Sequence, residues 1–193
     1  MRLIRFIATP IAAAIAFLVL FFATIHLNTR EAKVQQFYTY ITDKNKSHFT
    51  LDDGTKIILN RNSCFTYSDA YGTDQRKVNL EGEAYFDVAE DGRPFQVITS
   101  QGEVTVLGTA FGISSYMDKA EYTTLVRGCV RYTSHTKKSV ILSPGEQAIL
   151  ERSGELISRK VEVEEYVGWK DGVFVFRDKP LEEIMETLSR WYG

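Results

Sequence analysis

The sequence predicts a mainly β protein that opens with a transmembrane helix and ends in a strand–helix fragment of a small α+β domain. Three observations support this prediction. Residues 6–27 carry no formal charge, the apolar side chains of residues 79–113 fall on alternate positions, and those of residues 181–192 recur at helical spacing. A period of two is typical of half-buried strands, and a period of 3.6 is typical of helices. The expected core is therefore a meander of short strands.

Length and composition leave room for one good-sized core. The chain has 193 residues, of which 44% are hydrophobic and 12% aromatic, and its formal net charge is −2. A protein that binds a nucleic-acid backbone gains its affinity from clustered Lys and Arg side chains. The charge balance therefore argues against a nucleic-acid partner.

Residues 1–29 are expected to form an N-terminal transmembrane anchor. As a helix rising about 1.5 Å per residue, the uncharged run of residues 6–27 is about 33 Å long, which matches a hydrocarbon core of about 30 Å. A cleaved secretory signal is the alternative, but its apolar region is usually about 7 to 15 residues long and ends at small residues. Arg2 and Arg5 favour a cytoplasmic N-terminus. Both interpretations export the rest of the chain.

Residues 30–47 are predicted to be a linker and a first strand, and residues 48–166 an all-β domain. Asp52, Asp53 and Gly54 separate two β-forming runs, which is a hairpin signal. Further short β-forming runs follow at close spacing. Alternation alone does not separate a solenoid-like stack of coils from a twisted sandwich, so both architectures remain open.

Residues 167–193 are predicted to begin a small α+β domain that is truncated. Residues 173–176, Val-Phe-Val-Phe, favour a strand, and Pro180 is typical of the first position of a helix, where its missing N–H costs nothing. The following helix is amphipathic and therefore needs a surface to cover. The expected order is a strand followed by a helix.

No group of residues points to catalysis, a metal or a cofactor. His26, His48 and His135 share no metal-ligand spacing. No nucleotide-binding loop or hydrolase motif occurs. Neighbouring carboxylates such as those of Asp52 and Asp53 lie in an expected turn, where a solvated pair is more common than a general acid and base. We therefore expect that the protein is not an enzyme.

The two cysteines, Cys64 and Cys129, lie 65 residues apart in strand-like runs. In an exported domain they could form a disulfide. Burial as two small apolar side chains is the favoured interpretation, because sequence alone does not bring their Cβ atoms within bridging distance.

Seven short sequence motifs, taken together and in order, resemble the FecR family of membrane-anchored sigma-factor regulators. They span about residues 45–192 and are LDDGTKIILN (51–60), RKVNLEGEAYFDV (76–88), PFQV (94–97), VTVLGTAF (104–111), TLVRGCV (124–130), LSPGEQA (142–148) and WKDGVFVF (169–176). A helix that closes with Arg190, Trp191 and Tyr192 is similar to the Bacteroidetes type of this family.

The resemblance implies a single-pass inner-membrane anti-sigma regulator, with its N-terminus in the cytoplasm and the bulk of the chain in the periplasm. Members of the family relay a signal from the signalling domain of a TonB-dependent outer-membrane transducer to an extracytoplasmic-function (ECF) sigma factor, which they hold through a cytoplasmic N-terminal segment. Only residues 1–5 precede the expected span, so that segment is expected to be absent here. The expected action is protein binding, without a cofactor.

Four aromatic residues are candidates for binding the transducer's signalling domain: Trp169, Phe174, Trp191 and Tyr192. They could instead close the core of the small C-terminal domain, and both interpretations remain open. Two other functions are kept as alternatives. An exported carbohydrate-binding module would need an exposed aromatic platform, and a cell-envelope hydrolase would need a cleft with paired carboxylates or a nucleophile.

Overall fold

The computed structural model describes residues 13–24, 35–73 and 75–192. The chain divides into two compact units, Met1–Val34 and Gln35–Gly193, and each is described by itself. In the first unit, residues 13–24 form a helix with exposed side chains. Within the described part of the chain, no helix has both the length and the apolar character needed to cross a membrane. The expected span of residues 6–27 includes residues that lie outside the described part, so it stays a prediction.

The second unit is mainly β, which confirms that part of the predicted fold class. Its described residues form thirteen strands: β1 (Phe37–Thr42), β2 (Ser47–Thr50), β3 (Lys56–Leu59), β4 (Ser63–Ser68), β5 (Arg76–Asp87), β6 (Phe95–Ile98), β7 (Gly102–Val106), β8 (Ala110–Ser115), β9 (Glu121–Arg127), β10 (Val130–Ser134), β11 (Ser139–Leu142), β12 (Glu146–Leu150) and β13 (Leu156–Lys160). The expected hairpin around residues 52–54 is present between β2 and β3, and Gly54 supplies the positive φ, +85°, that its turn needs.

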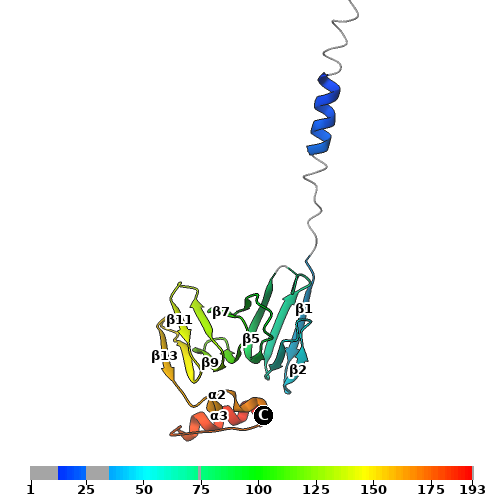
Figure 1. The fold of residues 1–193 in the computed structure, drawn as a ribbon. Helices are drawn as coiled ribbons and strands as arrows, with labels where there is room; N and C mark the ends of the chain where they lie inside the picture. Colours follow the sequence, from blue (N-terminus) through cyan, green and yellow to red (C-terminus); the bar gives the residue numbers. More distant parts are fainter. Residues whose placement is uncertain (1–12, 25–34, 74, 193) are drawn as a thin grey trace, which may run out of the picture. The chain divides into compact units, whose positions relative to one another are not determined.

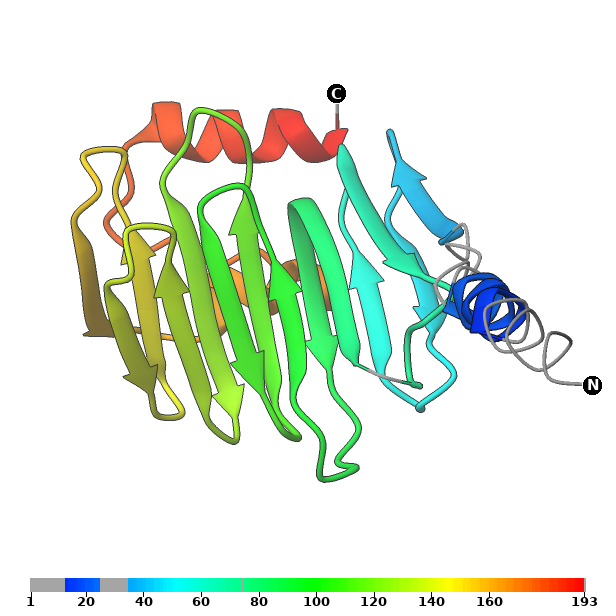
Figure 2. The ribbon, with the colours of Figure 1, turned by 90° about the horizontal axis from the view of Figure 1, so that it is seen from above.

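The strands form two layers that share one long strand. Sheet A has the order β1-β4-β5-β6-β7-β10-β11, and sheet B has the order β2-β3-β5-β8-β9-β12-β13. Among the described strands, only the pairing of β5 with β6 is parallel. Figure 1 shows β11, β7 and β1 along one layer and β13, β9 and β2 along the other, and Figure 2 looks onto the strands lying side by side. Two facing layers make the unit a sandwich.

Strand β5 joins the two layers because it changes partners halfway along its length. Its first half pairs with β4 and β6 in sheet A, and its second half pairs with β3 and β8 in sheet B. Gly82 lies at the change, with a φ of +97°. A Cβ atom at this position would lie 2.8 Å from the Cα atom of Ser63, so the approach of β4 requires glycine here.

The hydrophobic core fills the space between the layers. Every second residue of β5 faces it, as the alternation predicted. Phenylalanine rings from both sheets meet there: the ring of Phe86 lies 5.1 Å from that of Phe111, 6.0 Å from that of Phe95 and 6.3 Å from that of Phe65, measured between centroids. These four rings are fully buried and make contact across the sandwich.

The segment after β13 folds back beside sheet B. It contains the short helix α2 (Glu164–Val167), the 3₁₀ helix η1 (Gly168–Asp171) and the helix α3 (Leu181–Tyr192). Helix α3 confirms the predicted helix, although it begins one residue after Pro180, which was expected at its first position. The predicted boundary between residues 166 and 167 falls inside α2 and stays a prediction. Figure 1 shows α2 and α3 next to the sheet B layer.

The strand predicted at residues 173–176 is wrong. These residues have no strand assignment and no ladder partner, although their apolar alternation is that of a strand. A strand is stable only when its backbone N–H and C=O groups find a neighbouring strand. Here the segment connects η1 to α3, and Phe174 stacks on Phe176 with ring centroids 6.5 Å apart.

Candidate functional site

A cavity of about 400 Å³ lies between the outer face of sheet B and the segment that follows β13. We call it the C-terminal groove. Its lining includes Gly112, Tyr122 and Thr124 from the sheet, and Trp169 and Phe174 from the C-terminal segment. It mixes aromatic and charged side chains, as binding sites commonly do.

A row of polar residues crosses three strands of sheet B, and two of its members, Thr124 and Arg159, line the groove. The amide of Gln147 donates a hydrogen bond of 2.8 Å to the hydroxyl of Thr124, and the guanidinium of Arg159 lies 3.4 Å from the amide oxygen of Gln147. Arg159 also donates to the hydroxyl of Tyr166 in α2, at 2.9 Å. Because Thr124 and Gln147 are buried, these bonds satisfy polar groups that the C-terminal segment removes from water.

Helix α2 approaches the sheet closely where strand β8 carries Gly112. A Cβ atom at Gly112 would lie 2.8 Å from the Cγ1 atom of Val167. Val167 is 1% exposed and Trp169 is 6% exposed, so the two side chains anchor α2 and η1 against the sheet. A lysine from the β1–β2 connection supports the same segment, since the Nζ atom of Lys46 donates to the carbonyl oxygen of Lys170 at 2.6 Å.

Two of the four predicted partner-binding residues come together in this groove. Trp169 is buried and Phe174 is half-buried, and both line the groove. The side chains of Trp191 and Tyr192 lie outside the described part of the chain. A role of these four residues in binding a partner stays a prediction.

The charged lining of the groove has a cationic excess. The cationic side chains are those of Arg61, Lys119, Arg159 and Lys179, and the anionic ones are those of Glu83 and Glu165. Glu165 pairs with Arg177, with a distance of 3.5 Å between Oε1 and Nε. Burial, followed by the charge of Glu151, raises the pKa of Tyr122, which keeps its hydroxyl neutral. An acidic partner surface would complement this lining.

Sequence reasoning did not single out Arg159, Tyr166 or the polar row. The signal was weak, because a polar residue on every second position of a strand is read as a solvated face. In the structure that face of sheet B is covered, and its polar residues lie under the C-terminal segment.

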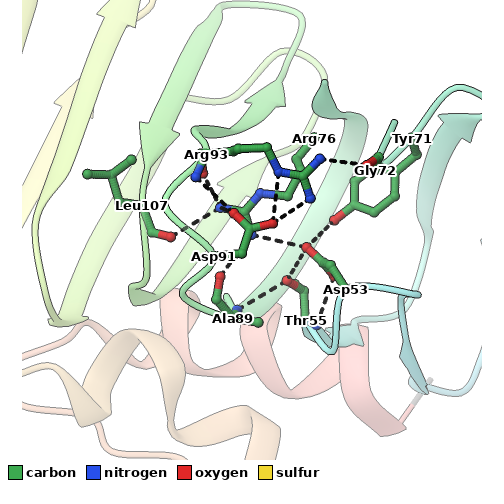
Figure 3. A network of polar contacts seen from close by, with 9 residues as sticks. All are labelled: Asp53, Thr55, Tyr71, Gly72, Arg76, Ala89, Asp91, Arg93 and Leu107. Atoms are coloured by element: carbon green, nitrogen blue, oxygen red, sulfur yellow. Dashed lines mark hydrogen bonds and ion pairs between the residues drawn. The ribbon is translucent and has the colours of Figure 1, made fainter. Parts of the chain in front are cut away.

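A second polar site lies inside the sandwich, around the guanidinium of Arg76 (Figure 3). Its Nη1 atom donates to the carboxylate of Asp53 at 3.1 Å and to the carbonyl oxygen of Ala89 at 2.8 Å. Its Nη2 atom donates to the carbonyl oxygens of Arg93 and of Leu107, and it pairs with the carboxylate of Asp91 at 3.1 Å. Arg76 thus ties the β2–β3 turn, the β5–β6 loop and the β7–β8 turn together.

The pKa values of Asp53 and Tyr71, beside Arg76, are shifted from their usual values. Burial of the Asp53 carboxyl acts to raise its pKa, but hydrogen bonds from Thr55, Tyr71 and Arg76 outweigh burial, so the pKa of Asp53 lies below its usual value. Burial, together with the neighbouring Asp53, raises the pKa of Tyr71 well above its usual range. The network centres on a fully buried guanidinium, reaches the surface only at Asp91 and Arg93, and holds loops, so we regard it as structural.

Neither a metal cluster nor a disulfide occurs among the residues that the structure describes. No three metal-ligating side chains of His, Cys, Asp or Glu gather in that part of the chain. Cys64 on β4 and Cys129 in the β9–β10 turn are both free thiols. The favoured interpretation, burial of both side chains, is wrong: Cys64 is half-buried and Cys129 is exposed.

Known sequence families match the chain in two places. The pattern of the FecR protein family matches residues 38–131, which include strands β2 to β9 and all of β1 but its first residue, and the FecR C-terminal pattern matches residues 173–193. No functionally curated protein matches the chain.

Solved structures share the fold. Two crystal structures of a proposed anti-sigma factor from Parabacteroides distasonis ATCC 8503 are similar to this chain. The first has 29% identity and a TM-score of 0.74, covering 80% of this chain and 74% of that one. The second has 28% identity and a TM-score of 0.72, covering 82% and 75%. With two family patterns matched in order and a shared fold, the chain belongs to the FecR family.

Proposed function

We propose that this chain is the exported sensor part of a single-pass inner-membrane anti-sigma regulator. In this proposal it relays a signal from a TonB-dependent outer-membrane transducer to an ECF sigma factor, and it acts by binding proteins. The observation that carries the proposal is the ordered match of both FecR patterns on a fold shared with a proposed anti-sigma factor.

The uncharged run of residues 6–27 supports the membrane anchor in this proposal, with the N-terminus in the cytoplasm and the β sandwich in the periplasm. Alkaline phosphatase is active only outside the cytoplasm, so a fusion after Gly193 tests the orientation. We expect an active fusion that sediments with membranes. Recovery of the chain in the cytosolic fraction would contradict the proposal.

The C-terminal groove is the docking site that we propose for the transducer's signalling domain. It offers an aromatic side chain, Phe174, beside a cationic lining that suits an acidic surface. Aromatic residues in pockets carry a large share of the binding energy in protein interfaces. The test is a titration of the full chain, in detergent, with the purified signalling domain.

We expect Phe174→Ala to weaken this binding at least about tenfold, since each 1.4 kcal/mol is a factor of ten. Trp191→Ala should also weaken it without unfolding the sandwich. The matched control is Ile141→Ala, which removes an exposed apolar side chain from β11, outside the groove. Equal binding by all variants, or no binding at high micromolar concentrations, would count against the groove.

The alternative of a carbohydrate-binding module has less support. In the described part of the second unit, the exposed aromatic residues that could form its platform are Phe37, Tyr38 and Tyr40 of β1. Sugars stack on open ring faces, but one face of Tyr40 is covered by Phe49, with ring centroids 4.1 Å apart and an interplanar angle of 6°. Binding to a glycan array would favour this alternative.

A further inference from the structure

Strand β1 is an open edge of sheet A. Among the described strands it pairs only with β4, so one side of its backbone faces away from the sandwich. The sandwich has four such edges: β1 and β2 end the two layers on one side, and β11 and β13 end them on the other (Figure 1). An open edge is a template for another strand unless charged side chains protect it.

The four edges are protected to different degrees. Strand β13 contains Arg159 and Lys160. The other three edge strands have charged residues only beside them: Lys138 precedes β11, Lys46 precedes β2, and Asp43 and Lys44 follow β1. Strand β1, with six residues, is longer than β2 and β11, with four each, and every one of its residues is aromatic or β-branched, the types that favour strands. It also exposes large apolar groups, since the side chain of Ile41 is 77% exposed and that of Phe37 is 59% exposed. This edge is the one most open to pairing.

The faces of β1 restrict which strand could be added. Tyr40 is paired with Phe65, which lies in the core, so Tyr38 and Tyr40 are on the inner face of the strand. Phe37, Thr39 and Ile41 are on the outer face. In an antiparallel pair, residues directly opposite one another share a face. An added strand must therefore match apolar with apolar on both faces.

A second copy of β1 meets this requirement. A two-fold axis at Thr39 places Phe37 opposite Ile41 of the second copy and Tyr38 opposite its Tyr40, with the two Thr39 residues at the centre. Both outer pairs are then apolar, both inner pairs are aromatic, and no charges meet. Moving the axis to Tyr40 would place Phe37 opposite Asp43, which is much less favourable.

We propose that two copies of this chain associate through their β1 edges, in this antiparallel register, so that their A sheets become one continuous sheet. The contact does not involve the C-terminal groove, and its failure would leave the proposed function untouched. A single added strand is a small interface, so the dimer should be weak. Crosslinking is therefore a better probe than chromatography.

The test uses the full chain in detergent with Cys64→Ser and Cys129→Ser, and with a single new cysteine, Thr39→Cys. A short thiol crosslinker should give a covalent dimer. Adding Ile41→Lys, which places a charge opposite Phe37, should lower the dimer yield at least about tenfold. Ile141→Lys is the matched control, because it places the same charge at a 60% exposed position on β11, and it should leave the yield unchanged.

The register has its own test. In the proposed pairing, residue 37 lies opposite residue 41 of the second copy, while two residues 37 lie four positions apart, about 13 Å at about 3.3 Å per residue. Phe37→Cys and Ile41→Cys should each crosslink poorly alone and well when mixed. Absence of a Thr39→Cys dimer, a dimer that survives Ile41→Lys, or equal crosslinking from Ile141→Cys would overturn the proposal.

Discussion

The guanidinium of Arg76 lies inside the sandwich, where an unpaired charge would be strongly unfavourable. Its side chain is fully buried, and its two terminal nitrogens have partners in three separate loops. The planar guanidinium suits this role because it directs several donors in fixed directions. The centre of the group also lies 5.8 Å from the ring centroid of Phe95. One side chain thereby fixes the geometry of one end of the sandwich.

We expect Arg76→Met to destabilise the chain by about 3–5 kcal/mol, because it leaves the buried carboxylate of Asp53 without its cation. The side chain of Asp53 is only 6% exposed, so water cannot replace the lost partner. Chemical denaturation followed by tryptophan fluorescence measures the change. Arg131→Met removes an exposed arginine from β10 and should change the free energy of unfolding by less than about 0.5 kcal/mol. Equal effects of the two substitutions would show that the network is not stabilising.

The lowered pKa of Asp53 predicts an acid-sensitive stability. A carboxyl whose pKa is lower in the folded state stabilises the fold above the unfolded pKa of about 3.9, and this contribution is lost as the pH falls through the folded pKa. Thermal unfolding should therefore show a steep loss of stability below about pH 4. Asp53→Asn should be less stable at neutral pH and should flatten this dependence, whereas Asp52→Asn, at an exposed position of the same turn, should keep it.

The sequence contained a signal for Arg76 that is easy to misread. Arg76 is in phase with Val78 and Leu80, which the alternation places in the core. A charged residue in phase with a core face indicates a buried ion pair, but its partners Asp53 and Asp91 come from loops that only the folded chain brings near. The alternation along β5 could therefore identify Arg76 as a buried charge. Its partners, Asp53 and Asp91, could be identified only from the structure.

At the scale of elements, the sequence predicted correctly those features that depend on neighbouring residues in the chain, and failed for those that depend on distant ones. The helix after Pro180 was predicted correctly because its capping and its amphipathic spacing are local. The strand at residues 173–176 was predicted wrongly because a strand depends on a neighbour that sequence spacing does not reveal. The C-terminal groove could be predicted only in part: Trp169 and Phe174 were singled out, but the polar row of sheet B beneath them was not.

Because α2 packs closely against strand β8, a larger residue at Gly112 should destabilise the chain, and a smaller residue at Val167 should reverse part of this loss. Gly112→Ala places a methyl group 2.8 Å from the Cγ1 atom of Val167, so α2 must move, at a cost of about 1–3 kcal/mol. Trp169 lies two residues further on, and its fluorescence should shift to the red as α2 and η1 loosen. Combining Gly112→Ala with Val167→Ala removes the clash and should recover part of the loss. A double variant whose loss equals the sum of both single losses would show that the two positions are not coupled.

At the scale of the whole molecule, β5 makes the two sheets one cooperative unit. Its alternation continues unbroken through Gly82, so one strand contributes core residues to both layers. This explains why the sequence left solenoid and sandwich undecided, since period-two alternation is the same in both. The choice depends on where β5 changes partners, and that depends on a glycine whose role is visible only beside Ser63.

Substitution of Gly82 should therefore weaken both sheets together. Gly82→Ala puts a side chain at a φ of +97° and brings its Cβ atom to 2.8 Å from the Cα atom of Ser63. Gly154→Ala is the matched control, because Gly154 has a similar φ of +81° but no atom within 4 Å of the added Cβ, so it carries the backbone strain alone, about 1–2 kcal/mol. We expect Gly82→Ala to cost about 1–3 kcal/mol more than the control, through overpacking. Hydrogen exchange should speed up in β7 and β10 of sheet A as much as in β9 and β12 of sheet B, because the strain acts on the strand that they share. Faster exchange in one sheet alone would mean that the layers unfold independently and that β5 does not couple them.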